Sequence, residues 1–279
     1  MTLLISLVPS LPLSFQAQTS ADGVSGATGL AEAYDQDDYG TAYQLTLSLA
    51  EKGDVEAQVL LGRMFARGRG VRRDQAKAVK WFRKAADQGH GLAQSILGLR
   101  YAYGRGVPQN DSQAIEWFRR GTKRGNAVAQ HNLGVMYENG KGTAKNDQQA
   151  AYWYRLAAEQ GVAHAQSNLG RMYSEGRGVT QDKLEAVKWF QKAAQRRFPQ
   201  AMHNLGVAYL KGEGLAQDNL KAYAWMHLAT QFSNGNWRTR AIYQQSTDLK
   251  VKLGERMTAK EIKKAENLSR KWRKKMPRR

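Results

Sequence analysis

The chain has 279 residues, of which 42% are hydrophobic and 24% charged, and it contains no cysteine. A chain of this length can bury a sizeable core, and the lack of cysteine excludes disulfides, thiolate-ligated metal sites and a thiol nucleophile. The 43 Lys and Arg residues against 24 Asp and Glu residues give a net charge of +19, which favours an anionic partner or surface. All Lys and Arg residues follow position 51. No charge-free apolar run of about 18 residues follows the N-terminus, so we expect no internal membrane span.

The N-terminal segment has the composition of an export signal. Residues 3–15, LLISLVPSLPLSF, are apolar and uncharged, and small residues that a signal peptidase could cut follow at Thr19–Ala21. This length is typical of a signal-peptide core. We therefore expect residues 1–21 to be a signal peptide and the protein to be periplasmic or secreted. No basic residue precedes the run, and Pro9 and Pro12 lie within it, so the alternative is an uncleaved N-terminus and a cytoplasmic protein.

Residues 22–54 look like a degenerate N-terminal half-repeat, and residues 55–232 repeat five times with a period of 36. Each unit has a Leu-Gly pair, an aromatic residue three positions after that glycine, a Gly-x-Gly loop and a tryptophan. The tryptophans are Trp81, Trp117, Trp153, Trp189 and Trp225, and the loop glycines are Gly68/Gly70, Gly104/Gly106, Gly140/Gly142, Gly176/Gly178 and Gly212/Gly214. Internal periods of this length are the signature of stacked repeat architectures.

Within each unit the apolar residues follow helical spacing on both sides of the Gly-x-Gly loop. In the first unit Ala57, Leu60, Leu61 and Met64 share one helical face. Glycine tolerates the positive φ that ends a helix, and an Asp or Asn able to cap the second helix follows each loop, at Asp74, Asn110, Asn146, Asp182 and Asp218. The pattern predicts five helical hairpins and an all-α fold. One hairpin cannot bury both of its faces, so the hairpins must stack.

The period ends near Phe232, and residues 233–279 have the pattern of a helical cap with a basic tail. The sequence predicts a turn at residues 233–236, a helix over 237–253, and a last helix that begins at the capping-box pattern Thr258-x-x-Glu261 and ends near Lys275. Residues 250–279 contain thirteen basic and three acidic residues.

The repeated pattern A-x3-LG-x2-Y-x2-G-x-GV-x3-D-x3-A-x2-WF-x2-AA-x2-G resembles the Sel1-like repeat, a relative of the tetratricopeptide repeat. The resemblance is strong over residues 55–232 and weak over 29–54, and the segment MTAKEIKKAENLS resembles the tail that closes many bacterial members. It implies a right-handed α-solenoid of stacked helix hairpins with a C-terminal helical cap. It also implies an adaptor that holds a protein or peptide partner in a concave groove.

By analogy with tetratricopeptide grooves, the outward positions of each first helix would line that groove. The first candidates for partner contact are Arg63, Tyr103, His131, Arg171 and His203. A mixture of cationic, aromatic and imidazole side chains suits a peptide or helix. The alternative is an ordinary solvated face.

A second hypothesis is polyanion binding, with an envelope polymer or a nucleic acid as the partner. The loops carry Arg69, Arg105, Lys141 and Arg177 between their glycines, and the tail carries Lys271, Trp272 and Arg273. Such cations could contact phosphates, and Trp272 would suit an interfacial anchor. The alternatives are solubility charge on exposed loops and a solvated, frayed helix end.

Nothing in the sequence points to catalysis. The five histidines include no H-E-x-x-H motif and no closely spaced pair, and no S-x-x-K motif of serine hydrolases occurs. We therefore expect no enzyme activity, no cofactor and no bound metal.

Overall fold

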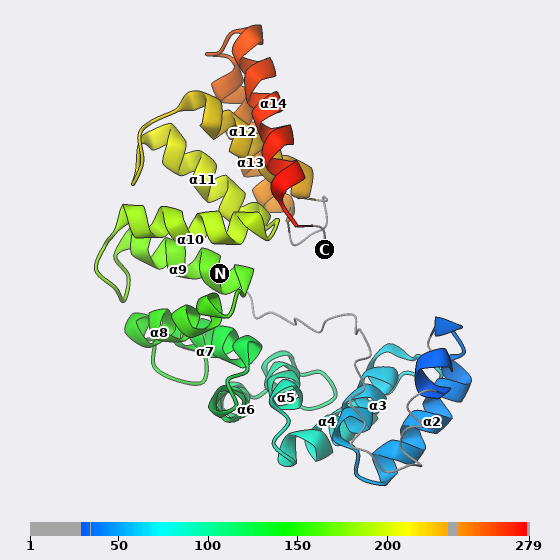
Figure 1. Ribbon diagram of the computed structural model, residues 1–279. Helices are drawn as coiled ribbons and strands as arrows, with labels where there is room; N and C mark the ends of the chain where they lie inside the picture. Colours follow the sequence, from blue (N-terminus) through cyan, green and yellow to red (C-terminus); the bar gives the residue numbers. More distant parts are fainter. Residues whose placement is uncertain (1–28, 34, 234–238, 278–279) are drawn as a thin grey trace. The chain divides into compact units, whose positions relative to one another are not determined.

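The computed structural model describes residues 29–33, 35–233 and 239–277, and these residues form helices without any strand (Figure 1). The predicted all-α class is therefore confirmed for the described chain. The predicted signal peptide, residues 1–21, lies outside this part. None of the described helices is both long and apolar enough to cross a membrane.

The chain divides into two compact units, residues 1–145 and 146–279. The first contains α2 (Tyr39–Glu51), α3 (Val55–Arg67), α4 (Gln75–Asp87), α5 (Gly91–Tyr103), α6 (Asp111–Lys123) and α7 (Ala127–Asn139). The second contains α8 (Asp147–Glu159), α9 (Ala163–Glu175), α10 (Lys183–Gln195), α11 (Pro199–Lys211), α12 (Asn219–Phe232), α13 (Arg240–Gly254) and α14 (Ala259–Lys275).

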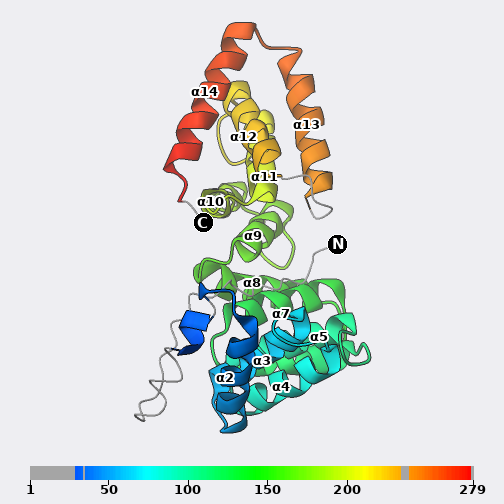
Figure 2. The ribbon, with the colours of Figure 1, turned by 90° about the vertical axis from the view of Figure 1, so that its right-hand side faces the viewer.

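Within each unit the helices pack in chain order, as a solenoid requires. In the first unit α3 packs against α4 and α5 against α6, and α4 also contacts α5. In the second unit α9 packs against α10 and α11 against α12 (Figure 2). Each hairpin thus buries one face in its own pair and another against its neighbour, the arrangement that stabilises repeat proteins.

The predicted helix ends form as the sequence indicates. The Asp74 side chain accepts a hydrogen bond from the Lys77 backbone N–H and caps α4, and the equivalent Asp or Asn caps α6, α8, α10 and α12 in the same way. The first helix of each hairpin ends at a left-handed glycine, for example Gly68 with φ 74°. The Leu-Gly glycines allow close packing: a Cβ on Gly62 would lie 2.7 Å from the Phe82 ring.

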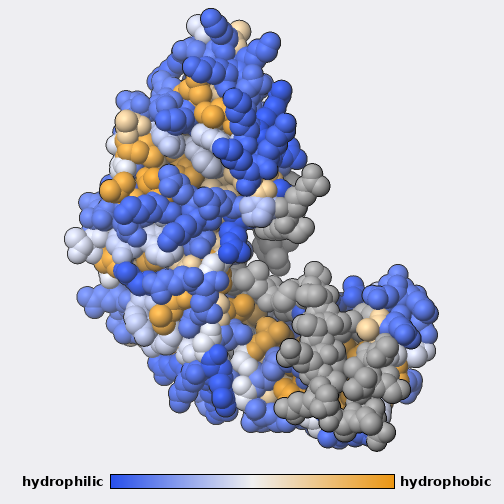
Figure 3. Space-filling model, in the orientation of Figure 1, coloured by the Kyte–Doolittle hydropathy of each residue, from blue (hydrophilic) through white to orange (hydrophobic). Residues whose placement is uncertain are grey.

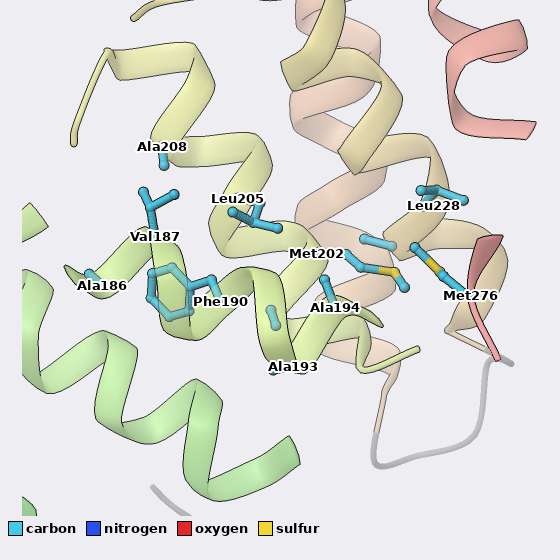
Figure 4. Packing of buried hydrophobic residues seen from close by; sticks show 12 residues of the cluster. Ala186, Val187, Phe190, Ala193, Ala194, Met202, Leu205, Ala208, Leu228 and Met276 are labelled. Atoms are coloured by element: carbon cyan, nitrogen blue, oxygen red, sulfur yellow. The ribbon is translucent and has the colours of Figure 1, made fainter. Parts of the chain in front are cut away.

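Two helices beyond the repeats, α13 and α14, both pack against α12. The predicted capping box at the start of α14 is present, with Thr258 and Glu261 bonded to each other's backbone N–H. Met276, just after α14, is buried in one cluster with residues of α10, α11 and α12, including Phe190, Met202 and Leu228 (Figure 4). The C-terminal segment therefore completes a hydrophobic core.

Candidate functional site

The structure places the predicted groove residues of the first unit in different environments. Tyr103, the last residue of α5, is 44% exposed, whereas Arg63 on α3 is 7% exposed and His131 on α7 is fully buried. The His131 Nδ1 atom lies 3.2 Å from Oδ1 of Asn132. Arg63 and His131 therefore cannot contact a partner unless the residues around them move. Tyr103 can.

In the second unit α13, a helix that does not belong to the repeats, covers one of the predicted groove residues. His203 on α11 is buried, because α13 packs against α11, and its Nδ1 atom lies 2.9 Å from the Ser246 hydroxyl of α13. Burial lowers the pKa of His203, which favours the neutral imidazole. Arg171 on α9 is partly exposed and pairs with Glu175, one turn later, at 3.3 Å. Of the two predicted residues, only Arg171 is accessible.

The Gly-x-Gly loops contact the preceding repeat instead of cradling a ligand. The second glycine of each loop lies against the backbone of the first residue of the preceding second helix: a Cβ on Gly142, for example, would lie 2.5 Å from the Asp111 carbonyl. The other contacts of this kind are Gly70 with Tyr39, Gly106 with Gln75, Gly178 with Asp147 and Gly214 with Lys183. Only glycine fits there, because it has positive φ and no side chain.

In two of the repeats the middle residue of the loop forms an ion pair with the side chain of that same helix-starting residue, 30 positions earlier. Arg177 donates from Nη2 to Oδ1 of Asp147 at 2.8 Å and from Nε to Oδ2 at 3.2 Å. In the next repeat the helix-starting residue is the base and the loop residue is the acid: Nζ of Lys183 lies 2.9 Å from Oε2 of Glu213. Arg177 is therefore held in an inter-repeat ion pair, which argues against its predicted role as an anion-binding residue.

The other predicted loop cations have different neighbours. Arg69 is exposed and lies 5.3 Å from the centre of the Tyr39 ring, and Arg105 is exposed and lies 5.4 Å from the centre of the Tyr103 ring. Lys141 is half-buried. Arg105 thus joins the exposed end of α5 that also carries Tyr103.

The basic C-terminal tail is a docked helix. Trp272 is half-buried and its ring stacks on that of Trp225 with centroids 4.5 Å apart, which argues against its predicted role as an interfacial anchor. Arg273 lies over the Phe232 ring, and its Nη1 donates to Oε1 of Gln231 at 3.3 Å. Lys271 is exposed, on a helix whose visible face is hydrophilic (Figure 3).

Arg100 on α5 is a charged residue near the Gly-x-Gly loops that the sequence pattern did not single out. Arg100 on α5 occupies a position where the neighbouring repeats have Met64, Met136 and Met172, so it looked like part of a core pattern. Its guanidinium donates a hydrogen bond to Oε1 of Gln75 and lies 5.3 Å from the centre of the Phe82 ring. Among the described residues no three His, Asp or Glu side chains are grouped so as to hold a metal ion.

Comparison with known proteins agrees with this architecture. Five segments match the Sel1 repeat: residues 55–90, 91–126, 127–162, 163–197 and 199–231. A crystal structure of a Sel1 repeat protein from Oxalobacter formigenes is 29% identical, covers 94% of this chain and 98% of its own, and has a TM-score of 0.74. The antigen c5321 of uropathogenic Escherichia coli is 26% identical over 90% of this chain and 69% of its own, with a TM-score of 0.43. No curated protein matches the chain. The repeats and their helical hairpins show that this chain belongs to the Sel1 repeat family.

Proposed function

We propose that this protein binds a protein or peptide partner along the first helices of its repeats, with Tyr103 as the principal contact. Sel1 repeat proteins are generally non-catalytic scaffolds for protein–protein interaction. In the first unit α5 presents an accessible side chain at Tyr103, and in the second unit, taken by itself, α9 presents the Arg171–Glu175 pair. Of the five residues predicted for partner contact, the accessible Tyr103 and Arg171 support the proposal, each within its own unit.

The exposed aromatic ring of Tyr103 is the observation that carries the proposal. Tyr103 is 44% exposed on a first helix, and Arg105 lies over its ring. Tyrosine and arginine are enriched among the residues that dominate binding energy at protein interfaces. The ring is large, rigid and amphipathic, so a partner can bury it at little cost in side-chain entropy.

The apolar segment at residues 3–15 supports a further part of the proposal, that the protein is exported and meets its partner in the periplasm or outside the cell. Intact mass and cell fractionation test this. A chain shortened near Ala21 in the periplasm or the medium is the expected result. A full-length chain in the cytoplasm would overturn the export proposal and leave the binding face unaffected.

Site-specific photo-cross-linking in the native cell tests the binding face. A photoreactive residue at Tyr103 should give a discrete cross-linked species, which mass spectrometry identifies. The matched control is Tyr152 on the second helix α8, which is 53% exposed and should give none. Cross-linking of the same partner from Tyr152, or none from either position, would refute the proposed face.

A further inference from the structure

Three arginines, Arg73, Arg100 and Arg105, lie near one another where the first and second repeats meet, and no carboxylate of the described residues forms an ion pair with them. Gln75 donates from Nε2 to the Ala66 carbonyl at 2.8 Å and accepts a hydrogen bond from Arg100. Its own backbone carbonyl lies against Gly106, so the loop that carries Arg105 packs on the same residue. Arg73 is two residues before Gln75 and packs against Gly68. Gln75 thus binds the Arg100 guanidinium directly and lies beside the two loops that carry Arg73 and Arg105.

At the same place in two later repeats an ion pair balances the charges. There the residue equivalent to Gln75 is charged, and it faces a loop residue of opposite sign: Asp147 with Arg177, and Lys183 with Glu213. At Gln75 the acid is missing, although Arg105 is present at the loop position. The core methionine is also replaced, at Arg100, by a third cation. The second repeat therefore has a loop cation, Arg105, but has Gln75 where a later repeat has the acid Asp147 that pairs with its loop cation.

The excess of positive charge affects the pKa of Arg100. Burial together with the charges of Arg105 and Arg73 lowers the pKa of Arg100 to about 10. None of the three arginines forms an ion pair within the described chain, and the nearby Asp74 is engaged at its helix, accepting from the Lys77 N–H at 2.8 Å. Like charges held together destabilise a fold unless an anion joins them.

We propose that Arg73, Arg100 and Arg105 form a binding site for an oxyanion, a carboxylate or phosphate group. Arg100 is fixed by Gln75 and by the Phe82 ring, so its planar fork is oriented before the ligand arrives. Guanidinium groups bind carboxylate and phosphate through paired, charge-assisted hydrogen bonds. Arg105 also contacts Tyr103, so the site adjoins the proposed partner contact. The inference rests on the proposed function only for the source of the oxyanion, a group carried by the partner.

Thermal unfolding of the full chain in inorganic phosphate tests the site. Phosphate should raise the Tm of the wild type to a plateau, above the effect of sodium chloride at equal ionic strength, because a ligand that binds only the folded state stabilises it. Gln75→Asp, which supplies the acid present at Asp147, should abolish this response. Arg100→Met, which installs the residue of the neighbouring repeats, should weaken phosphate affinity about tenfold or more, as expected for losing a charged hydrogen bond.

Lys141→Gln is the matched control, because it removes a cation from the equivalent loop position of the next repeat and should leave the phosphate response intact. The site is refuted if phosphate acts no more strongly than chloride, or if Gln75→Asp and Arg100→Met respond like the wild type. An acetylated tetraglutamate peptide distinguishes the sources: tighter binding of the peptide indicates a partner's carboxylates, and tighter binding of phosphate a small phosphorylated ligand. If Tyr103 fails to cross-link while phosphate binds as described, the proposed function fails and the site stands.

Discussion

The loop contacts between repeats can be tested by replacing one glycine. In Gly142→Ala the new Cβ would lie 2.5 Å from the Asp111 carbonyl, and the residue has φ of 65°. The left-handed backbone costs alanine about 1 kcal/mol, and forcing the loop away from the helix adds about 1–3 kcal/mol, as for other overpacked sites. We therefore expect Gly142→Ala to lower the free energy of unfolding by about 2–4 kcal/mol.

Gly125→Ala is the matched control in the same unit. Gly125 has φ of 70°, and a Cβ there would have nothing within 4 Å. It should suffer the backbone cost alone, about 1 kcal/mol. Urea unfolding followed by circular dichroism measures both variants. Equal losses for Gly142→Ala and Gly125→Ala would refute the claim that close loop contact, beyond the need for positive φ, makes glycine necessary.

Three further predictions concern the second unit. A double-mutant cycle with Asp147→Asn and Arg177→Gln should give a coupling energy of about 1 kcal/mol, because these paired side chains are only 25% and 29% exposed; a coupling near zero contradicts the inter-repeat pair. Because the folded pKa of His203 lies below its ordinary 6.5, the unfolded chain binds protons first, so the free energy of unfolding should fall as pH drops below about 6.5. His203→Gln should flatten that profile, and an unchanged slope counts against the buried imidazole. Trp272→Ala should cost about 2 kcal/mol in urea unfolding, since its ring stacks on another tryptophan; a loss within error means that α14 is not anchored there.

Local signals in the sequence were sufficient to locate the helices of the repeats. The capping residue Asp74, the terminating Gly68 and the capping box at Thr258 all act as their positions predicted. These features depend on residues within a few positions of one another, so a sequence shows them directly. The predicted helix over 237–253 is observed as α13, Arg240–Gly254, while residues 234–238 lie outside the described chain.

The accessible surface was harder to predict, because it depends on contacts between elements. His203 is buried by α13, a helix outside the repeat period, and no sequence pattern indicates that Ser246 would lie beside it. The pairing of Arg177 with Asp147 joins neighbouring repeats. Its constant spacing of 30 residues is visible in the sequence, but its meaning is clear only once the loop is known to pack on the preceding helix. Arg100 was overlooked because it replaces a core methionine.

The most direct test of the binding face is the affinity of the cross-linked partner, once purified, for two tyrosine variants. Isothermal titration calorimetry should show that Tyr103→Ala weakens binding by about 30-fold or more, the loss expected for an interface residue worth about 2 kcal/mol. Tyr152→Ala removes a somewhat more exposed ring from a second helix and should leave the affinity unchanged. Equal affinities for Tyr103→Ala and the wild type, or a greater loss for Tyr152→Ala, would contradict binding along the first helices.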